Sequence, residues 1–376
     1  MKNPFKYGVP VTGEYYLPRP FLIKKLTPYA ISGQKVLLYG PRRFGKTSFL
    51  QEFATHLTKY SIHSIIIDLY PITSHSDFLH ALTKAIKPYN IRSFMQFFKD
   101  TFSAIFRIRP KINLEPTHVS LDFSIDSMNS DDIKTAIEDT MRMLGEFHKK
   151  QKLMVLFDEF QKIAEISDNG WLEGTLRSEI QKQQDVPYLF CGSRRGLILD
   201  MFQNTQRPFY HMAIPIEFPR FNDEFIDWLK KRFTKAHLSI SKSVIKYILD
   251  ITDWSPNYAQ MIAFHLIANH SHKEVIDKTI DSTLNEICTL NTYTYMTLFD
   301  SLSSNAQRLL RLAALNPGES PFKQELLQKF QLTNSTVQAA LKSLINKRIL
   351  DDSTSKGKLY FDDPLFLRWI QNAFRY

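Results

Sequence analysis

The residues with the clearest chemical capacity are 40–47, which read Gly-Pro-Arg-Arg-Phe-Gly-Lys-Thr. They match the GxxxxGK[ST] pattern, after an apolar segment typical of a strand and before one typical of a helix. Glycines at both ends let the backbone curl, so that successive N–H groups converge on an anion. We expect Lys46 to reach the β- and γ-phosphates of a nucleotide and the Thr47 hydroxyl to ligate Mg²⁺. The predicted nucleotide-binding residues of this segment are Gly40, Pro41, Arg42, Arg43, Phe44, Gly45, Lys46, Thr47 and Ser48.

Two arginines inside this loop have more than one interpretation. Arg42 and Arg43 could contact the phosphates or a neighbouring subunit. The simpler interpretation, which we favour, is two solvated cations beside a polyanion.

A pair of acids follows a second apolar segment. Residues 153–157 are Leu-Met-Val-Leu-Phe, and Asp158 and Glu159 come directly after them. A carboxylate at the carboxyl end of a buried parallel strand lies where such sheets bind ligands. We predict that Asp158 holds Mg²⁺ through water and that Glu159 orients or deprotonates the attacking water. Gln161 could sense the γ-phosphate, although a solvated glutamine is the simpler interpretation.

Polar residues also follow the apolar segment 188–191. Ser193 is our candidate for a hydrogen bond to the γ-phosphate or the attacking water. Arg194 is the predicted transition-state arginine, although Arg195, Arg207 and Arg177 compete for that role and each could equally be a surface cation. Asn346-Lys347 continues as Arg348-Ile349, so the guanine-specific NKxD pattern is missing and ATP is the expected nucleotide.

The order of the elements defines the fold class. Continuous apolar segments at 36–39, 62–69, 153–157 and 188–191 alternate with helical patterns, which predicts an α/β fold with a parallel sheet covered on both faces. Residues 111–126 alternate apolar and polar side chains around Pro116, which predicts a β-hairpin. After Phe218 the strand pattern stops, and helices are expected over 222–236, 241–251, 256–269 and 275–299.

The C-terminal part has the pattern of a winged helix. Helices are predicted at 304–315, 321–330 and 334–347, followed by a hairpin over 349–361. In a DNA reader the third helix would enter the major groove. Ser335, Thr336, Gln338 and Lys342 would then face outward, and Lys356 and Lys358 would meet phosphates. The helix is not strongly basic, and winged helices also contact proteins, so DNA binding stays an open alternative.

Composition sets broad limits. At 376 residues, two or three domains are expected, and 43% hydrophobic residues exclude wholesale disorder. The net charge of +10 fits a polyanion partner, but equally a solvated basic surface. Two cysteines make neither a disulfide framework nor a zinc site, so we expect a reducing, cytoplasmic location. No stretch approaches the roughly 18 apolar residues of a membrane span, so no membrane partner is predicted.

Taken with these motifs, the sequence resembles the P-loop ATPase family found predominantly in archaea, on the STAND branch near AAA+ ATPases. The resemblance covers almost the whole chain and rests on NPFKYG, YYLPRP, GPRRFGKTSFL, VLFDEFQKI, LFCGS, RPFY and ITDWSPNYAQ. It implies a P-loop NTPase core with a helical lid and a C-terminal winged-helix domain. The implied boundaries are 1–30 for an adenine-side segment, 31–218 for the core with a hairpin insertion at about 88–130, 219–300 for the lid and 301–376 for the winged helix.

The resemblance also implies further contacts. The segment before the first strand would pack on the adenine, through Tyr16, Leu17 and Arg19. A Gly-x-Pro turn of the lid would approach the nucleotide through Pro256. Here that turn reads Trp254-Ser255-Pro256, with the proline present and the glycine replaced. STAND ATPases resemble slow switches that change lid position and often oligomerise.

The expected activity is Mg²⁺-dependent ATP hydrolysis, in an ATPase that acts as a nucleotide-dependent switch coupled to a winged-helix module. The alternative is an ATP-modulated DNA-binding regulator or mobile-element accessory protein. A scaffold that binds nucleotide without hydrolysis is disfavoured by the intact Asp158–Glu159 pair. A protein partner or a homo-oligomer is compatible with either hypothesis.

Overall fold

The computed structural model describes residues 2–86, 107, 111–114, 119–122, 124–269, 274–351 and 359–374. Its contacts divide the chain into two compact units, each of which is described by itself. The core unit consists of Pro18–Gly40 and Lys46–Pro219, and the C-terminal unit consists of Met1–Leu17, Pro41–Gly45 and Arg220–Tyr376. Within the described residues, no helix is long and apolar enough to cross a membrane.

A five-stranded parallel sheet forms the centre of the core unit, with strand order β2-β5-β6-β1-β7. Its strands are β1 (Lys35–Tyr39), β2 (His63–Asp68), β5 (Leu153–Asp158), β6 (Tyr188–Gly192) and β7 (Ile214–Glu217). The first four confirm the strands predicted from apolar segments. The sequence pattern missed β7, because this four-residue edge strand contains Pro215 and buries only Ile216.

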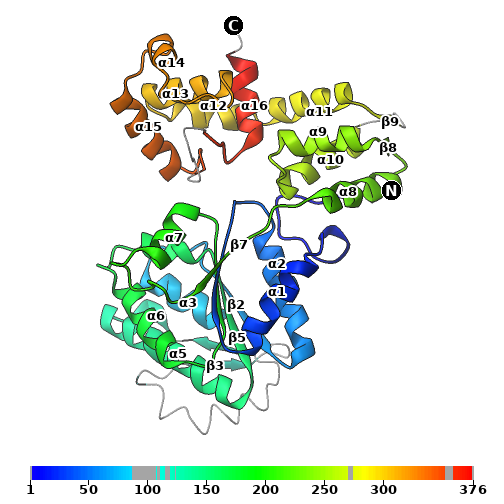
Figure 1. Cartoon of the computed structure of the whole chain (residues 1–376). Coiled ribbons are helices and arrows are strands. Elements are labelled where there is room, and N and C mark those ends of the chain that lie inside the picture. Colours follow the sequence, from blue (N-terminus) through cyan, green and yellow to red (C-terminus); the bar gives the residue numbers. More distant parts are fainter. Residues whose placement is uncertain are drawn as a thin grey trace. The chain divides into compact units, whose positions relative to one another are not determined.

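Helices cover both faces of this sheet (Figure 1). On one face lie α1 (Pro20–Ile31) and α2 (Lys46–Leu57). On the other lie α3 (His75–Lys84), α5 (Ser130–Lys150), α6 (Trp171–Lys182) and α7 (Arg195–Gln203). A single cluster of buried side chains joins this second face to the strands, with Phe157 and Phe190 stacked at 6.0 Å between ring centroids. The α/β fold class is therefore confirmed.

The insertion before α5 contains the predicted hairpin. Strands β3 (Lys111–Leu114) and β4 (Val119–Asp122) pair antiparallel, which confirms the alternation seen over 111–126. Pro116 and most of the range 88–110 lie outside the described residues. Helix α5 is capped by Asn129, whose side chain accepts hydrogen bonds from the Asp131 and Asp132 amides.

The C-terminal unit begins with helices α8 (Asp223–Lys235), α9 (Lys242–Ile251), α10 (Pro256–Asn269), α11 (Asp277–Leu290) and α12 (Thr292–Asp300). The single helix predicted over 275–299 is two helices, because the chain turns at Asn291, whose amide and side chain both bond the Ile287 carbonyl. A short parallel pair, β8 (Ser239–Ile240) and β9 (Glu274–Val275), joins two connections of this region.

The N-terminal residues belong to the same unit. Phe5 is buried against Trp228 and Phe233, and the Asn3 side chain donates to the Phe264 carbonyl at 3.0 Å. This segment is ordered without a long regular element, as its Pro, Gly and aromatic content indicates.

Helices α13 (Ser304–Leu315), α14 (Gln324–Lys329), α15 (Asn334–Asn346) and α16 (Pro364–Ala373) complete the unit, with a bridge between Leu350 and Phe361. Helix α15 begins at Asn334, as predicted, and is capped by Thr333, which forms a reciprocal capping box with Thr336. The half-buried Thr336 hydroxyl is therefore used at the helix start. Lys356 and Lys358, the predicted phosphate contacts of the wing, lie outside the described residues.

Candidate active site

The loop between β1 and α2 has the backbone that phosphate binding requires. A side chain at Gly40 would bring its Cβ within 2.8 Å of Phe218 Cβ, so only glycine fits. Arg43 and Gly45 have positive φ angles of 63° and 85°. Left-handed residues in such a loop turn N–H groups toward one side, and the positive end of α2, which begins at Lys46, adds to their field.

Lys46 is folded back onto this loop. Its side chain is buried, and Nζ donates a hydrogen bond to the Gly40 carbonyl at 3.0 Å. A phosphate group would offer the ammonium a charged acceptor in place of this neutral one, and charge-assisted bonds are roughly twice as strong.

The two predicted metal ligands are in direct contact. Thr47 Oγ1 donates to Asp158 Oδ2 at 2.6 Å, at the carboxyl end of β5. Burial raises the pKa of Asp158 to about 6, with the charges of Glu159 and Asp68 adding to the effect and the Thr47 hydrogen bond and Lys46 opposing it. A divalent cation at this point would favour the ionised carboxylate.

The donors suit Mg²⁺. Magnesium is held by one or two protein oxygens together with substrate phosphates and water. A hydroxyl and a carboxylate at 2.6 Å supply those protein oxygens. Among the residues that the structure describes, no group of three or more His, Cys, Asp or Glu could hold a metal ion by itself. The nucleotide would therefore have to complete the coordination.

The two predicted catalytic side chains beyond the loop also meet. Ser193 Oγ donates to Glu159 Oε2 at 2.7 Å. Glu159 has a φ of 54°, and this left-handed residue turns the chain from β5 into the short helix η4 (Phe160–Glu165). Gln161 donates from Nε2 to the same Glu159 oxygen at 2.5 Å and is fully buried. The simpler interpretation of Gln161 as a solvated residue is therefore wrong.

Each candidate for the transition-state arginine already has a partner in the core unit. Arg194 pairs with Glu165 at 2.9 Å, and Arg195 pairs with Glu217 at 3.1 Å. Arg207 bonds the buried Glu173 at 3.2 Å, and Arg177 donates to the Tyr210 carbonyl at 3.2 Å. A catalytic role for Arg194 stays a prediction that would need the Glu165 pair to open.

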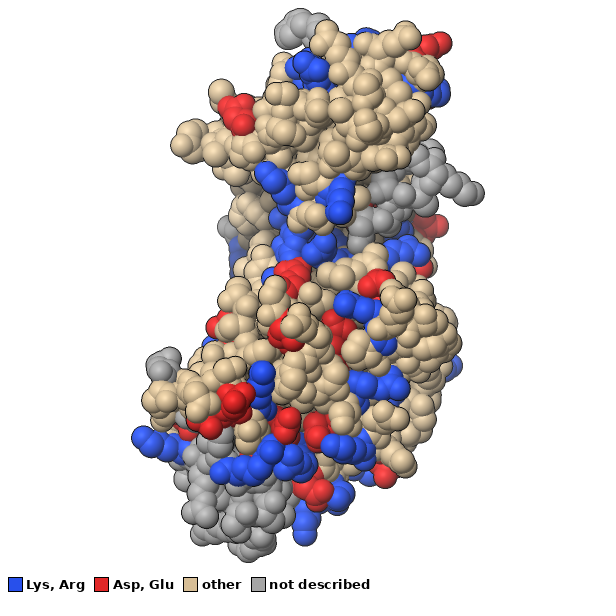
Figure 2. All heavy atoms as spheres, turned by 90° about the vertical axis from the view of Figure 1, so that its left-hand side faces the viewer, with Lys and Arg blue, Asp and Glu red and all other residues tan. Residues whose placement is uncertain are grey.

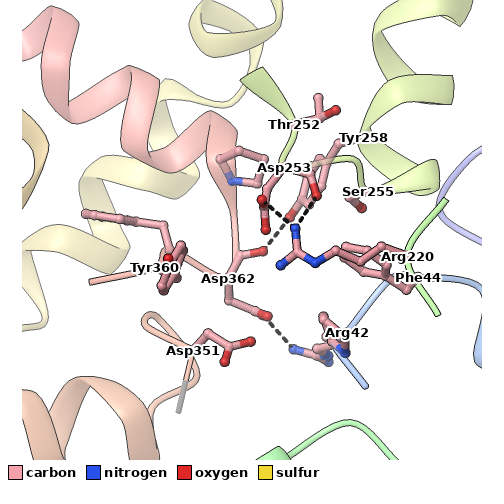
Figure 3. A pocket seen from close by; sticks show the side chains of 13 residues that line it. Arg42, Phe44, Arg220, Thr252, Asp253, Ser255, Tyr258, Asp351, Tyr360 and Asp362 are labelled. Atoms are coloured by element: carbon pink, nitrogen blue, oxygen red, sulfur yellow. Dashed lines mark hydrogen bonds and ion pairs between the residues drawn. The ribbon is translucent and has the colours of Figure 1, made fainter. Parts of the chain in front are cut away.

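The loop arginines, which we interpreted from the sequence as solvated cations, each have a partner in the C-terminal unit. Arg42 Nη1 lies 3.5 Å from Asp362 Oδ2, within an ion pair whose side chains are 29% and 17% exposed. Arg43 donates to the Tyr258 hydroxyl and lies over its ring, 4.9 Å from the centroid. Asp362 and Tyr258 line one pocket of the C-terminal unit with Arg42 (Figure 3).

Sequence reasoning did not single out Tyr258 or Asp362. Tyr258 stands two residues after Pro256, and Asp362 directly precedes Asp363, the cap of α16. Tyr258 lies within the family segment ITDWSPNYAQ and near the start of the helix predicted over 256–269, and these were the signals available for it. Asp362 has no motif of its own.

Comparison with known families decides the assignment of the chain. The family described as "ATPase domain predominantly from Archaea" matches residues 19–260. The chain belongs to this family. A probable winged helix domain matches residues 293–372.

Solved structures agree with this archaeal ATPase fold. A Walker-type ATPase of Pyrococcus abyssi, paby2304, is 18% identical, with 95% of this chain and 97% of that chain covered at a TM-score of 0.63. The ORC2 protein of Aeropyrum pernix, solved as ADPNP–ADP complexes, is 12% identical, with 94% and 91% covered at a TM-score of 0.53. These likenesses show the fold. A search of curated proteins finds no match.

The contacts implied by family resemblance alone stay predictions. Pro256 opens α10, and Trp254 adopts a φ of 59° where the family turn has glycine. The turn is held by the Trp254 amide, which donates to the Leu249 carbonyl at 2.7 Å. Tyr16 is buried in the C-terminal unit. Arg19, in the core unit, is buried over the Phe218 ring at 4.2 Å.

Proposed function

We propose that this archaeal-family ATPase hydrolyses ATP with Mg²⁺ as its metal ion. The observation that carries the proposal is the hydrogen bond of 2.6 Å between the half-buried Thr47 and the buried Asp158. It joins the start of the phosphate-loop helix to the end of β5, which is the arrangement that a nucleotide-bound Mg²⁺ needs. A nucleotide-binding scaffold would need no acid such as Glu159 held beside this pair.

Each of these residues has its own role in the proposed reaction. Lys46 and the loop N–H groups of 40–47 bind the β- and γ-phosphates, and Thr47 and Asp158 hold the metal ion. Bound Mg²⁺ neutralises charge that develops on the phosphates. Glu159 accepts the proton of the attacking water.

The direct test is phosphate release by the purified chain. ATP with Mg²⁺ should give turnover, and removal of Mg²⁺ by a chelator should abolish it. GTP should be a poorer substrate, because the chain lacks the guanine-specific pattern. Absence of turnover at saturating ATP·Mg would contradict the enzymatic assignment.

We propose further that nucleotide binding is coupled to the winged helix, as in the switches of the STAND branch. The support is the pair of loop arginines. Arg42 bonds Asp362, next to the cap of α16, and Arg43 bonds Tyr258 of α10, whose hydroxyl also donates to the Asp362 carbonyl at 3.4 Å. Phosphates would compete with Asp362 for the Arg42 guanidinium group and with Tyr258 for that of Arg43. By linkage, a phosphate that binds Arg42 must weaken the ion pair between Arg42 and Asp362, which holds the segment before α16.

Replacing Asp362 by Asn should therefore tighten ATP binding. The variant removes the carboxylate that competes with phosphate for Arg42, and we expect roughly 3- to 10-fold higher affinity for a partly exposed pair. Calorimetric titration with ATP·Mg measures this.

The matched control is Asp281→Asn, which breaks the ion pair of Asp281 with Arg368 at 3.0 Å but touches no loop residue. It should leave ATP affinity unchanged. If Asp362→Asn binds ATP no more tightly than this control, the loop arginines do not couple the nucleotide to the winged helix.

DNA binding by the winged helix is the second candidate function. The observation in its favour is the outer face of α15, where Ser335, Gln338 and Lys342 are exposed. Figure 2 shows the side of the C-terminal unit that carries α14 and α15, and most of that surface is uncharged, with isolated charges of both signs. Weak, salt-sensitive binding is the most that such a surface supports.

If α15 meets a phosphate through Lys342, Lys342→Ala should reduce the slope of log K against log[salt] by about 0.9. A duplex shift assay with the full chain, with and without ATP, measures it. The exposed Lys230 of α8 provides a control substitution, Lys230→Ala, which should leave the slope intact. No binding even at about 50 mM salt would leave a protein partner or a second copy as the occupant of this surface.

A further inference from the structure

Gln161 has no role in the proposed reaction so far, although it is fully buried beside Glu159. It stands two residues after Glu159, in the first turn of η4. Its Nε2 donates to Glu159 Oε2 at 2.5 Å. An ionised carboxylate only accepts hydrogen bonds, so the amide nitrogen of Gln161 must face it. Burial of a polar side chain with such a specific partner calls for an explanation.

The two donors to Glu159 converge on one oxygen. Oε2 accepts from both Gln161 Nε2 and Ser193 Oγ, at 2.5 Å and 2.7 Å. Among the residues that the structure describes, none donates a hydrogen bond to the other oxygen, Oε1. The carboxylate of Glu159 is thus held by one oxygen, and the second is left to accept a proton from water.

The oxygen end of the Gln161 amide is also held in place. Its Oε1 packs against Gly192 at the end of β6, where a Cβ would come within 2.5 Å of that oxygen. No hydrogen-bond partner for this oxygen occurs in the described part of the chain. The amide therefore cannot turn or retreat easily, and its position is set by the absence of a side chain at Gly192.

The hydrogen bond from Ser193 to Glu159 is easier to lose than the one from Gln161. A hydroxyl has one proton to donate, and here Ser193 donates it to Glu159. If Ser193 turns to a γ-phosphate, as the proposed reaction expects, it must release Glu159. The buried amide of Gln161 would then be the donor that stays.

We infer that Gln161 is a positioning residue for Glu159: it holds Oε2 and thereby aims Oε1 at the attacking water. This inference rests on the proposed ATPase function. Gln161 touches neither the nucleotide nor the metal ion in this account, so its removal should change turnover and leave nucleotide binding intact.

The test is Gln161→Met in the full chain, which keeps the length and burial of the side chain but removes the donor. We expect kcat to fall by about 10-fold or more, with KM for ATP and the calorimetric Kd for a non-hydrolysable ATP analogue within about twofold of the wild-type values. Should Gln161→Met fail to fold, Gln161→Leu is a smaller apolar substitution that also removes the donor, and the same loss in kcat is expected.

A matched control is Gln183→Met. Gln183 is another glutamine with a hydrogen-bonded amide: it donates to the Met141 carbonyl at 2.8 Å and accepts from the Tyr188 hydroxyl at 2.6 Å, at the opposite end of β6. It should lower the melting temperature without lowering kcat. Wild-type kcat in the Gln161 variants, or a loss of analogue affinity that equals the loss of kcat, would overturn the inference while the ATPase assignment stands. A wild-type chain without turnover would overturn both.

Discussion

Replacing Lys46 by Ala should abolish tight binding of ATP·Mg. Lys46 is the side-chain cation that the motif places on the β- and γ-phosphates, and the structure holds its ammonium group buried against the Gly40 carbonyl. Loss of one partner from a buried, hydrogen-bonded charge pair costs about 2–5 kcal/mol, which is roughly 30- to 5,000-fold in affinity. Calorimetry with ATP·Mg measures the change directly.

The interpretation of this variant depends on two controls. Lys59→Ala removes an exposed lysine of the short helix η2 (Thr58–Tyr60), just beyond α2, and should keep wild-type affinity. Thermal unfolding of Lys46→Ala without nucleotide should still show a cooperative transition, so that a loss of ATP affinity is measured on a folded chain. An ATP affinity for Lys46→Ala equal to that of the wild type would refute the phosphate-binding assignment of the loop.

Replacing Glu159 by Gln should have the opposite signature, with binding kept and turnover lost. The amide preserves shape, and its oxygen can still accept the hydrogen bonds from Ser193 and Gln161. Its nitrogen then occupies the position that faces water, where it cannot take a proton. A positioned general base contributes about 10²- to 10⁴-fold, so a fall in phosphate release of at least 100-fold is expected.

Phosphate release and calorimetric ATP affinity should be measured on the same preparation of Glu159→Gln. Glu146→Gln is a suitable control, because Glu146 lies on α5 and pairs with the exposed Lys149 at 2.6 Å. The control should keep most of the activity. Undiminished phosphate release by Glu159→Gln would mean that another carboxylate acts as the base, and Asp68 at the end of β2 would be the next to test.

Taken together, the two variants separate binding from chemistry. Lys46 acts on the ground-state complex, so its loss appears in Kd. Glu159 acts on the water, so its loss appears in kcat. A chain in which both substitutions only raise Kd would be a nucleotide-binding scaffold, which is the alternative that the acidic pair disfavours.

The sequence by itself determined the phosphate loop and the contacts between residues that stand at the ends of neighbouring strands. The pattern at 40–47 lies between a strand and a helix, and any chain that forms those elements must curl between them. Asp158 follows five apolar residues, so it must emerge at the carboxyl end of a buried strand, and the contact with Thr47 follows from that placement. Ser193 reaches Glu159 for the same reason, because β5 and β6 are neighbouring parallel strands.

Only the tertiary structure decided which side chains are buried and what they meet across long stretches of chain. Gln161 looks like a surface residue in sequence, but η4 packs its amide against Gly192 of another strand. Arg42 and Arg43 were interpreted as solvated cations, and nothing in the sequence indicated their partners Asp362 and Tyr258, which follow more than 200 residues later. Local propensity cannot encode such pairs, because the contacts exist only after separate elements have packed. The edge strand β7 escaped prediction for the same reason, since its pairing with β1 stabilises a short, half-exposed segment that no apolar pattern marks.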